Sequence, residues 1–394
     1  MKIGLLGFEF DSSNKGCEAL SYALMPILVD IAGSEKLTIV NFDIHDSMGE
    51  VPHRYPNVSF INVKIHLKKK KFWKKCVDEM KSCDVVLDIT HGDSFSDIYG
   101  KKWFIQTSIL KSLVILLKRP LILMPQTYGP YDSKWAKRWA KWIINRAKRA
   151  YCRDTSSARF LAKLCRNDPS CYPVVTDLAF ALPFNKNQYS QTFDKTDQLI
   201  VGINISGLLW DDCEHQRNAY KLKTNYIEYC EKLIDQLQKT YNCMVYLVPH
   251  VICDNREGQD YYENDCKAIR KLINKFPKCK FELDFNNAED VKSYISNLDI
   301  LIAARMHASI AAFSSGVITI PFAYSKKFKG VYLDLNYPYI IDGNNLTTEE
   351  AINKTIEYIK ERYKLRDSSG AGLEKIKLGN ASFETSLKNV LGRL

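Results

Sequence analysis

Short apolar runs that alternate with helical stretches constrain the fold of this chain more than any other feature. The first half contains six such runs, each followed by polar or amphipathic sequence: KIGLLGF, LTIVNFDI, VSFINVKI, CDVVLDIT, PLILMPQ and RAYCRD. Buried strands that alternate with helices are typical of a parallel sheet with helices on its faces. The pattern therefore predicts an α/β fold built from βαβ units.

The alternation breaks at PFNKNQYSQTFDKTD, residues 183–197, and then resumes with LIVGINISG, CMVYLVPH, KFELDF, DILIAAR and VITIPFAY. A chain of 394 residues is long enough for two cores. We expect two Rossmann-like domains with parallel sheets and a central cleft, at 1–185 and 197–345. The remainder, 346–394, should be a helix beginning near Thr347 and a loosely ordered tail.

The composition of the chain indicates in which cellular compartment the protein works. MKIGLLGFEF lacks the pattern of a signal peptide, and the most apolar window, SILKSLVILLKRPLILMP, is interrupted by basic residues and Pro120, so we expect no membrane span. Twelve cysteines occur without a C-x-x-C pair or a metal-ligand cluster. These features predict reduced thiols, no metal and a cytoplasmic protein.

The net charge of +11 is concentrated in residues 64–75 and 134–149. In the second segment Trp135, Trp139 and Trp142 recur at helical spacing, with the basic residues largely elsewhere on the helix. One interpretation is a solvated helix with its tryptophans in the core. Another is a peripheral face for anionic lipid, or for a lipid-linked substrate at the inner face of the membrane. We expect no nucleic acid partner, because no nucleic-acid-binding motif accompanies the charge.

Polar residues follow three strands of the first half, where parallel sheets place their sites. They lie in NKGCEAL, HGDSFSD and PQTYGP, and the candidates are Asn14, Gly16, Glu18, His91, Asp93, Gln126 and Tyr128. A glycine at the first of these junctions would let backbone amides approach an anion. Each motif is also explained by ordinary turn and capping chemistry.

The second half carries the strongest signal, in AARMHASIAAFSSG. Arg305 should lie at a strand end and His307 at the start of a helix that ends near Gly316. A cation at a helix N-terminus opposes the helix dipole, so its presence indicates that an anion binds there. The alternative is an internal ion pair with Asp299 or Asp177.

Further candidates should reach the same edge of the sheet. His250 ends the strand CMVYLVPH, although a lone histidine is more often structural. Tyr324, Lys326 and Lys327 follow the strand VITIPFAY, and Ser309 lies in the helix after His307.

At these residues the chain resembles the polysaccharide pyruvyl transferase family over most of its length. The motifs that carry the resemblance are NKGCEAL, HGDSFSD, PQTYGP, RDTSSARFL, TDLAF, LVPH, ARMHASIAAFSSG and IPFAYSKKFKGV. The chain departs from the family at Cys17, where aspartate is common, and at HGD, residues 91–93, which replaces a more glycine-rich turn.

The resemblance implies a GT-B-like pair of domains and transfer of pyruvate from phosphoenolpyruvate onto two hydroxyls of a sugar, as a cyclic ketal. Phosphoenolpyruvate would be a co-substrate, and no cofactor is implied. We expect His307, Arg305 and His250 to be catalytic. We expect the donor to be bound in the second domain by Arg305, Lys327, Lys326, Tyr324 and Ser309.

The acceptor would be galactose or another hexose of a glycan or of a lipid-linked saccharide precursor. Its candidate residues are those of the first half listed above, together with Asp177 of TDLAF. Two other functions stay open at this point. One is a GT-B glycosyltransferase that uses a sugar nucleotide, and the other is a non-catalytic protein that binds anions or a membrane surface.

Overall fold

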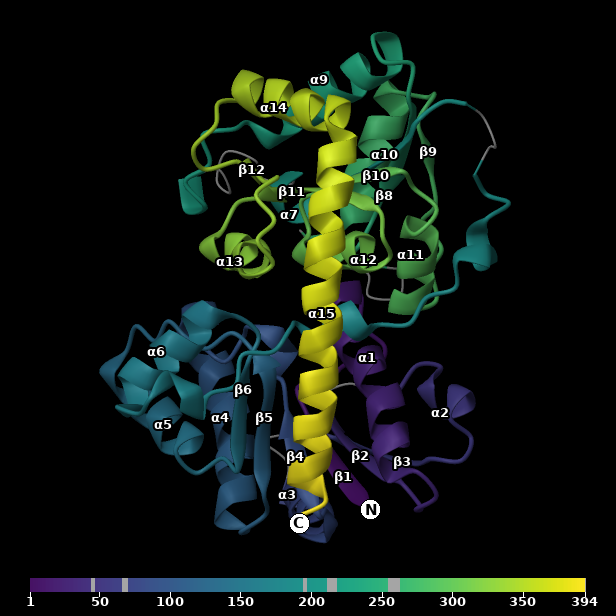
Figure 1. The fold of residues 1–394 in the computed structure, drawn as a ribbon. Helices are drawn as coiled ribbons and strands as arrows, with labels where there is room; N and C mark the ends of the chain where they lie inside the picture. The colour runs from purple at the N-terminus through teal and green to yellow at the C-terminus, as the bar shows by residue number, and fades with distance from the viewer. Residues whose placement is uncertain (44–46, 66–69, 194–196, 211–217, 254–262, 394) are drawn as a thin grey trace. The chain divides into compact units, whose positions relative to one another are not determined.

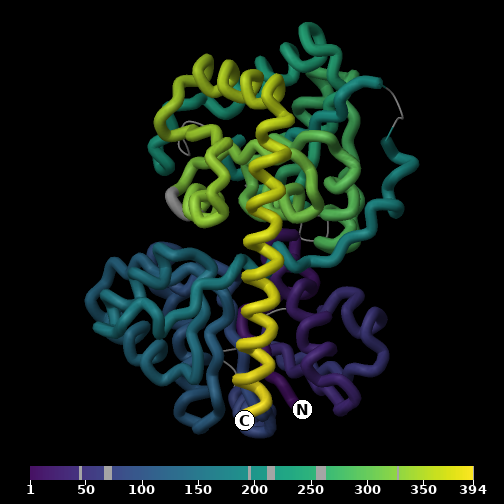
Figure 2. The backbone as a smooth tube through the Cα atoms, viewed as in Figure 1, coloured from purple at the N-terminus to yellow at the C-terminus, as the bar shows by residue number. Residues whose placement is uncertain are grey.

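The computed structural model describes residues 1–43, 47–65, 70–193, 197–210, 218–253 and 263–393, without the side chains of 70–72 and 326–327. The backbone is traced in Figure 2. Two compact units divide the chain. The first contains Met1–Ser12, Leu20–Leu178 and Lys377–Leu394, and the second contains Ser13–Ala19 and Ala179–Ile376.

The first unit is built on a six-stranded sheet in the order β3-β2-β1-β4-β5-β6, with all neighbours parallel. Its strands are β1 (Lys2–Leu6), β2 (Thr38–Asp43), β3 (Ser59–Lys64), β4 (Val85–Asp88), β5 (Leu121–Gln126) and β6 (Arg149–Cys152). The connecting helices are α1 (Lys15–Ala32), α2 (Val51–Arg54), α3 (Lys70–Ser82), α4 (Lys101–Leu116), α5 (Lys134–Ile144) and α6 (Thr155–Cys165). Short 3-10 turns are η1 (Thr90–Gly92), η2 (Asp97–Tyr99) and η3 (Pro169–Cys171). The predicted strand positions of this half are confirmed (Figure 1).

The second unit has its own parallel sheet, in the order β12-β11-β10-β7-β8-β9. Its strands are β7 (Ile200–Asn204), β8 (Met244–Val248), β9 (Lys280–Phe281), β10 (Ile300–Ala303), β11 (Ile318–Ala323) and β12 (Ile341–Asp342). Its helices are α7 (Gly207–Trp210), α9 (Tyr226–Lys239), α10 (Asp265–Lys275), α11 (Ala288–Ile295), α12 (Met306–Ser314), α13 (Lys326–Asp334) and α14 (Thr348–Lys360), and it begins with the turns η4 (Leu178–Ala181) and η5 (Lys186–Tyr189). The predicted fold class, α/β with two parallel sheets, is therefore confirmed.

The last helix, α15 (Arg362–Leu391), corrects the prediction of a loosely ordered tail. Its three interior glycines lower helix propensity, which favoured a disordered interpretation. Two of them lie on its packed face: a Cβ on Gly372 would be 2.7 Å from the Phe313 ring, and one on Gly379 would be 2.9 Å from Thr176. Close packing against the rest of the chain therefore stabilises this helix, in place of intrinsic propensity.

The tryptophan-rich helix α5 is mainly a packing element. Trp139 donates a hydrogen bond from Nε1 to Ser112 Oγ at 2.9 Å, and Trp139 and Trp142 pack against the core of the first unit. Trp135 is 39% exposed. The core interpretation thus describes two of the three tryptophans. Within the residues that the structure describes, no helix is long and apolar enough to cross a bilayer.

Candidate active site

Three strands of the second unit are joined at their carboxyl ends by one amide side chain. Asn204, the last residue of β7, accepts a hydrogen bond at 2.8 Å from the backbone N–H of Arg305 and donates one at 2.9 Å to the carbonyl of Val248. Arg305 is the N-cap residue of α12 and follows β10, as the sequence predicted. β7 lies between β8 and β10, so this is the switch point at which such sheets bind ligands.

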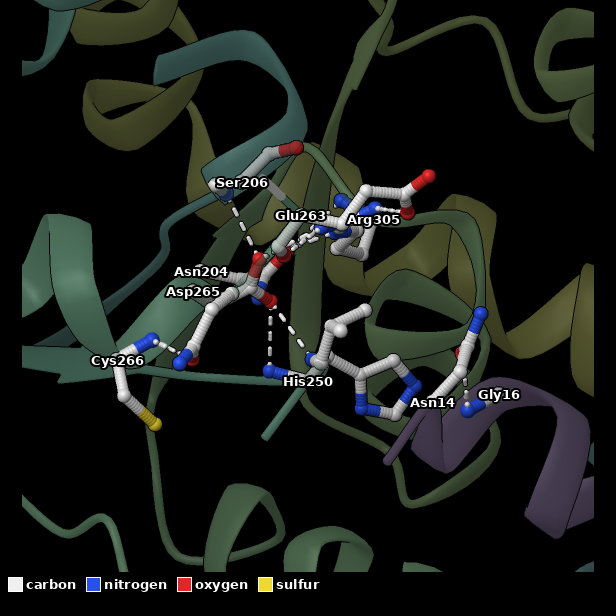
Figure 3. Close-up of polar contacts among 12 residues, drawn as sticks. Asn14, Gly16, Asn204, Ser206, His250, Glu263, Asp265, Cys266 and Arg305 are labelled. Atoms are coloured by element: carbon white, nitrogen blue, oxygen red, sulfur yellow. Dashed lines mark hydrogen bonds and ion pairs between the residues drawn. The ribbon is translucent and has the colours of Figure 1, made fainter. Parts of the chain in front are cut away.

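The guanidinium of Arg305 is buried between two carboxylates (Figure 3). Its Nη2 lies 2.8 Å from Asp265 Oδ1, and its Nη1 lies 3.1 Å from Glu263 Oε2. Burial is the largest single influence and lowers the pKa of Arg305, but the charges of Asp265, Tyr324 and Glu263 together with the hydrogen bond to Asp265 outweigh it, so the pKa is raised. An internal ion pair therefore exists, with partners other than the expected Asp299 and Asp177.

Asp265 also fixes the loop that carries His250. Its Oδ2 accepts hydrogen bonds from the backbone N–H groups of His250 and Val251 at 2.9 and 2.8 Å, and its Oδ1 accepts one from Gly207 at 2.7 Å. Because this carboxylate is fully buried, solvent does not weaken its hydrogen bonds. Arg305 and the His250 loop are consequently held by the same side chain.

The imidazole of His250 is buried without hydrogen-bond partners among the described residues. It is 3% exposed, and within the described residues neither ring nitrogen has a hydrogen-bond partner. Burial lowers the pKa of His250 well below its ordinary value, and His307, Arg305 and Lys15 lower it further. A buried polar group without a partner is uncommon enough to require an explanation, and a ligand is one such explanation.

Residues 13–19, which carry the first sequence motif, belong to this unit. Asn14 pairs with Val251 in an antiparallel bridge, and the N–H of Lys15 donates to the carbonyl of His250 at 3.0 Å. In Figure 3 the ring of His250 extends toward Asn14 and Gly16. The motif, whose residues we expected among the acceptor candidates of the first domain, therefore meets the second-half histidines.

Gly16 is the point of closest approach in this segment. A Cβ at this position would lie 2.4 Å from Nδ1 and 2.8 Å from Cγ of His307. Its N–H donates to Asn14 Oδ1 at 3.0 Å. Glu18, two residues further on, is buried and forms an ion pair with Lys15 at 3.1 Å. The glycine thus lets the start of α1 pack directly on the imidazole of His307.

The other donor candidates differ in their contacts. Tyr324 lies just after β11, packs on Tyr220 at 5.0 Å between ring centroids, and acts electrostatically on Arg305. Ser309 is buried and donates its hydroxyl hydrogen to the Met306 carbonyl of its own helix at 2.6 Å. The side chains of Lys326 and Lys327 lie outside the described residues, although both residues belong to the start of α13.

The first-unit candidates fall into two groups. Gln126, Tyr128 and Asp177 are buried and make internal contacts, to the carbonyl of Asp88, the carbonyl of Tyr151 and the guanidinium of Arg153 respectively. They support the sheet edge, because their polar atoms face the interior. His91 and Asp93 are partly exposed at the carboxyl end of β4.

Sequence reasoning missed Asn204, Glu263 and Asp265. Asn204 gave a usable signal, since it is a polar residue that ends an apolar run. Glu263 and Asp265 lie at the start of α10, and no spacing along the chain connects them with Arg305. Their role becomes visible only in three dimensions.

Solved structures define the class of fold. HepE from Anabaena in complex with UDP matches with a TM-score of 0.60 at 13% identity, and UDP-GlcNAc 2-epimerase from Neisseria meningitidis bound to UDP-GlcNAc with 0.63 at 13% identity. Each match covers 100% of both chains. At this identity the likeness concerns the fold alone, which is that of the two-sheet GT-B proteins.

The sequence itself defines the family. The profile of the polysaccharide pyruvyl transferase family matches residues 14–326, and the chain belongs to this family. A comparison with curated protein sequences gives no match. The matched range includes Gly16, His250, Arg305 and His307.

Proposed function

We propose that this protein transfers pyruvate from phosphoenolpyruvate onto two hydroxyls of a sugar in polysaccharide synthesis. The methylene carbon of the donor gains a proton, and the first hydroxyl oxygen attacks C2. The C2–O bond to phosphate breaks, and the second hydroxyl oxygen closes the cyclic ketal. Of the two hydroxyl protons, one is balanced by the new methyl group and the other leaves with phosphate.

The observation that carries the proposal is the pair of histidines at the carboxyl ends of β8 and β10. Both histidines meet the same segment, because the N–H of Lys15 donates to the carbonyl of His250 at 3.0 Å and a Cβ on Gly16 would lie 2.4 Å from Nδ1 of His307. Burial lowers the pKa of His250, and His307 lowers it further. An imidazole can give or take a proton near neutral pH. We assign His307 as the first general acid or base, and neutral His250 as the second candidate.

Arg305 is our first residue for the anionic donor. One side of its guanidinium is fixed by fully buried Asp265, whereas Glu263, on the other side, has 22% of its side chain exposed. A carboxylate therefore already occupies the outer side of the guanidinium. Nη2 also donates to the backbone carbonyl of Glu263 at 2.7 Å, so a carboxylate or phosphate of the donor that displaced the Glu263 side chain would receive its charge-assisted hydrogen bond from Nη1. Lys327, Lys326 and Tyr324 complete the proposed donor set.

The acceptor is proposed to be a hexose of a glycan precursor in the cytoplasm, and the excess of basic residues is compatible with a lipid-linked form at an anionic membrane face. The reaction as written balances without a redox partner, so we propose no cofactor.

Release of phosphate from phosphoenolpyruvate tests the proposal. The purified chain would be assayed with simple and lipid-linked galactosides, mannosides and N-acetylhexosaminides, and in parallel for UDP release from UDP-sugars. We expect acceptor-dependent phosphate release, and a loss of about 10²-fold or more in His307→Ala, as is typical of losing a general acid or base. Nucleotide release without phosphate release would refute pyruvyl transfer and favour a glycosyltransferase.

Arg305→Lys supplies a second readout. The planar fork is lost while the charge remains, so the KM for phosphoenolpyruvate should rise more than kcat falls. An unchanged KM would argue against donor binding by Arg305. Absence of turnover with any donor, together with binding to anionic vesicles that Arg305→Ala leaves intact, would favour a non-catalytic protein.

A further inference from the structure

The turn after β4 in the first unit has an unusual backbone. Three successive residues, Thr90, His91 and Gly92, have positive φ values of 41°, 54° and 83°. Only glycine adopts this region freely, and for a β-branched residue such as threonine it is a genuine outlier. A non-glycine residue in this region costs about 1–3 kcal/mol and persists only where its surroundings impose the conformation.

The ends of neighbouring strands impose this conformation. Thr90 Oγ1 donates to Asp88 Oδ2 at 2.9 Å, and Asp88 forms a buried ion pair with Lys111 at 3.0 Å. Gly7, after β1, approaches so closely that a Cβ there would lie 2.7 Å from Thr90 Cα. The N–H of Thr127, after β5, donates to the carbonyl of Gly92 at 2.8 Å. The turn is therefore held from three strands.

The result of this strain is the position of His91. Its Nε2 lies 3.0 Å from Glu9 Oε1, and its ring stacks on Trp103 with 5.1 Å between centroids and 25° between planes. Glu9 follows β1 and His91 follows β4, the adjacent strands at the switch point of this sheet. Both side chains are largely buried but keep an exposed part, 17% of His91 and 15% of Glu9.

Glycine at position 91 would adopt this backbone without cost, yet the chain has histidine. The imidazole therefore has to make interactions that offset the backbone strain. Its ion pair with Glu9 and its stacking on Trp103 are two such interactions.

The charges around His91 indicate what it can bind. Burial would lower the pKa of His91, but Glu9, Asp43 and Asp93 together raise it. Even when His91 is protonated, the three carboxylates outnumber it, so this group is acidic. Asp93 also accepts a hydrogen bond from Tyr99 at 2.8 Å. Arg153, which Gly92 approaches, interacts electrostatically with Asp93, but it also interacts with Asp154 and forms an ion pair with Asp177, so it does not reverse this charge.

We infer that Glu9, His91 and Asp93, beside Trp103, form a subsite for a neutral hydroxyl-rich ring, such as the acceptor sugar. Carboxylates accept hydrogen bonds from hydroxyls, an aromatic ring packs on the C–H face of a sugar, and the acidic surroundings disfavour anions such as phosphoenolpyruvate. The identification of this ring as the acceptor rests on the proposed function, whereas the binding site does not.

A binding experiment without donor tests the subsite. Full-length protein would be titrated with methyl β-galactoside, methyl α-mannoside and methyl β-glucuronide, and binding followed by saturation-transfer NMR. We expect saturable binding of at least one neutral glycoside and at least tenfold weaker binding of the anionic glucuronide. His91→Gly should weaken neutral binding at least tenfold while its melting temperature stays the same or rises, because glycine removes the strain.

Lys118→Gly is the matched control. Lys118 is exposed and has a φ of 55°, so the substitution makes the same backbone change without altering the subsite. Glu9→Gln, which keeps the shape and removes the charge, should weaken binding as His91→Gly does. Wild-type affinity in His91→Gly, equal loss in Lys118→Gly, or no saturable binding of either neutral glycoside would each overturn the inference.

These outcomes are separable from those of the proposed function. Saturable glycoside binding that depends on His91, without any phosphate release from phosphoenolpyruvate, would support the subsite and refute pyruvyl transfer. Phosphate release with an acceptor KM that His91→Gly leaves unchanged would support pyruvyl transfer and refute the subsite.

Discussion

Replacing Gly16 by alanine places one methyl group against the imidazole of His307. The added Cβ would lie 2.4 Å from Nδ1 of His307, where an ordinary contact is about 3.5–4.0 Å. Gly16 has no positive φ, so alanine suits its backbone, and α1, of which it is the second residue, would gain up to about 1 kcal/mol from the better helix former. The strain therefore falls on the contact with His307.

The ring must retreat by about 1 Å to restore normal contact. A displacement of this size in a group that takes part in the chemistry costs about 10²-fold in rate, which corresponds to about 2.7 kcal/mol in the barrier. We therefore expect Gly16→Ala to reduce turnover about 100-fold in the phosphate-release assay, while its melting temperature changes by only a few degrees.

The control is Gly370→Ala in α15, because a Cβ at Gly370 meets nothing within 4 Å. It should keep full activity. The double variant Gly16→Ala with His307→Ala should be no slower than His307→Ala alone, since the methyl group acts through the ring. Wild-type turnover in Gly16→Ala, or additive losses in the double variant, would refute the reasoning.

Three further predictions concern stability. Asp265→Asn breaks a buried ion pair and should lower the free energy of unfolding by about 3–5 kcal/mol in urea titrations, and a loss below about 1 kcal/mol would contradict the geometry. Burial lowers the pKa of His250, so the folded state keeps this histidine neutral and loses stability as the pH falls below about 6.5, the usual pKa of an unfolded histidine. His250→Gln should therefore flatten the decline in melting temperature between pH 7 and pH 5. Parallel melting curves of wild type and variant would contradict this role of His250. Gly372→Ala should destabilise by about 1–3 kcal/mol against the Phe313 ring, whereas Gly370→Ala should stabilise slightly; equal effects would be inconsistent with the packed face of α15.

The strands could be read from the sequence because strands of a covered parallel sheet are buried on both faces and appear as continuous apolar runs. The run that ends at Gln126 and the run that ends at Ala303 are examples. β12 has only two residues, too few to leave a pattern. The last helix was missed for a different reason, since Gly372 and Gly379 are read as helix breakers unless their packing partners are known.

Topology also explains how much of the site was accessible. His250 follows β8 and Arg305 follows β10, the two strands that flank β7. The rule that parallel strands end at the same edge of a sheet was therefore enough to group these residues. The carboxylates Glu263 and Asp265 reach Arg305 from the start of a helix, at a distance along the chain that no motif encodes. The contact between Gly16 and His307 likewise joins two segments about 290 residues apart in the chain, so no local motif predicts it.

Neither compact unit is one continuous piece of chain. The first is completed by residues 377–394, where Phe383 packs edge-on against Tyr151 at 5.2 Å and Ser386 shares a hydrogen bond with the Tyr151 hydroxyl at 2.8 Å. The second borrows residues 13–19. A single cut therefore cannot yield two complete halves. A fragment designed to isolate the second sheet would have to carry Gly16 back to His307 on a grafted segment, and a fragment of the first would need its final strip of helix supplied in trans.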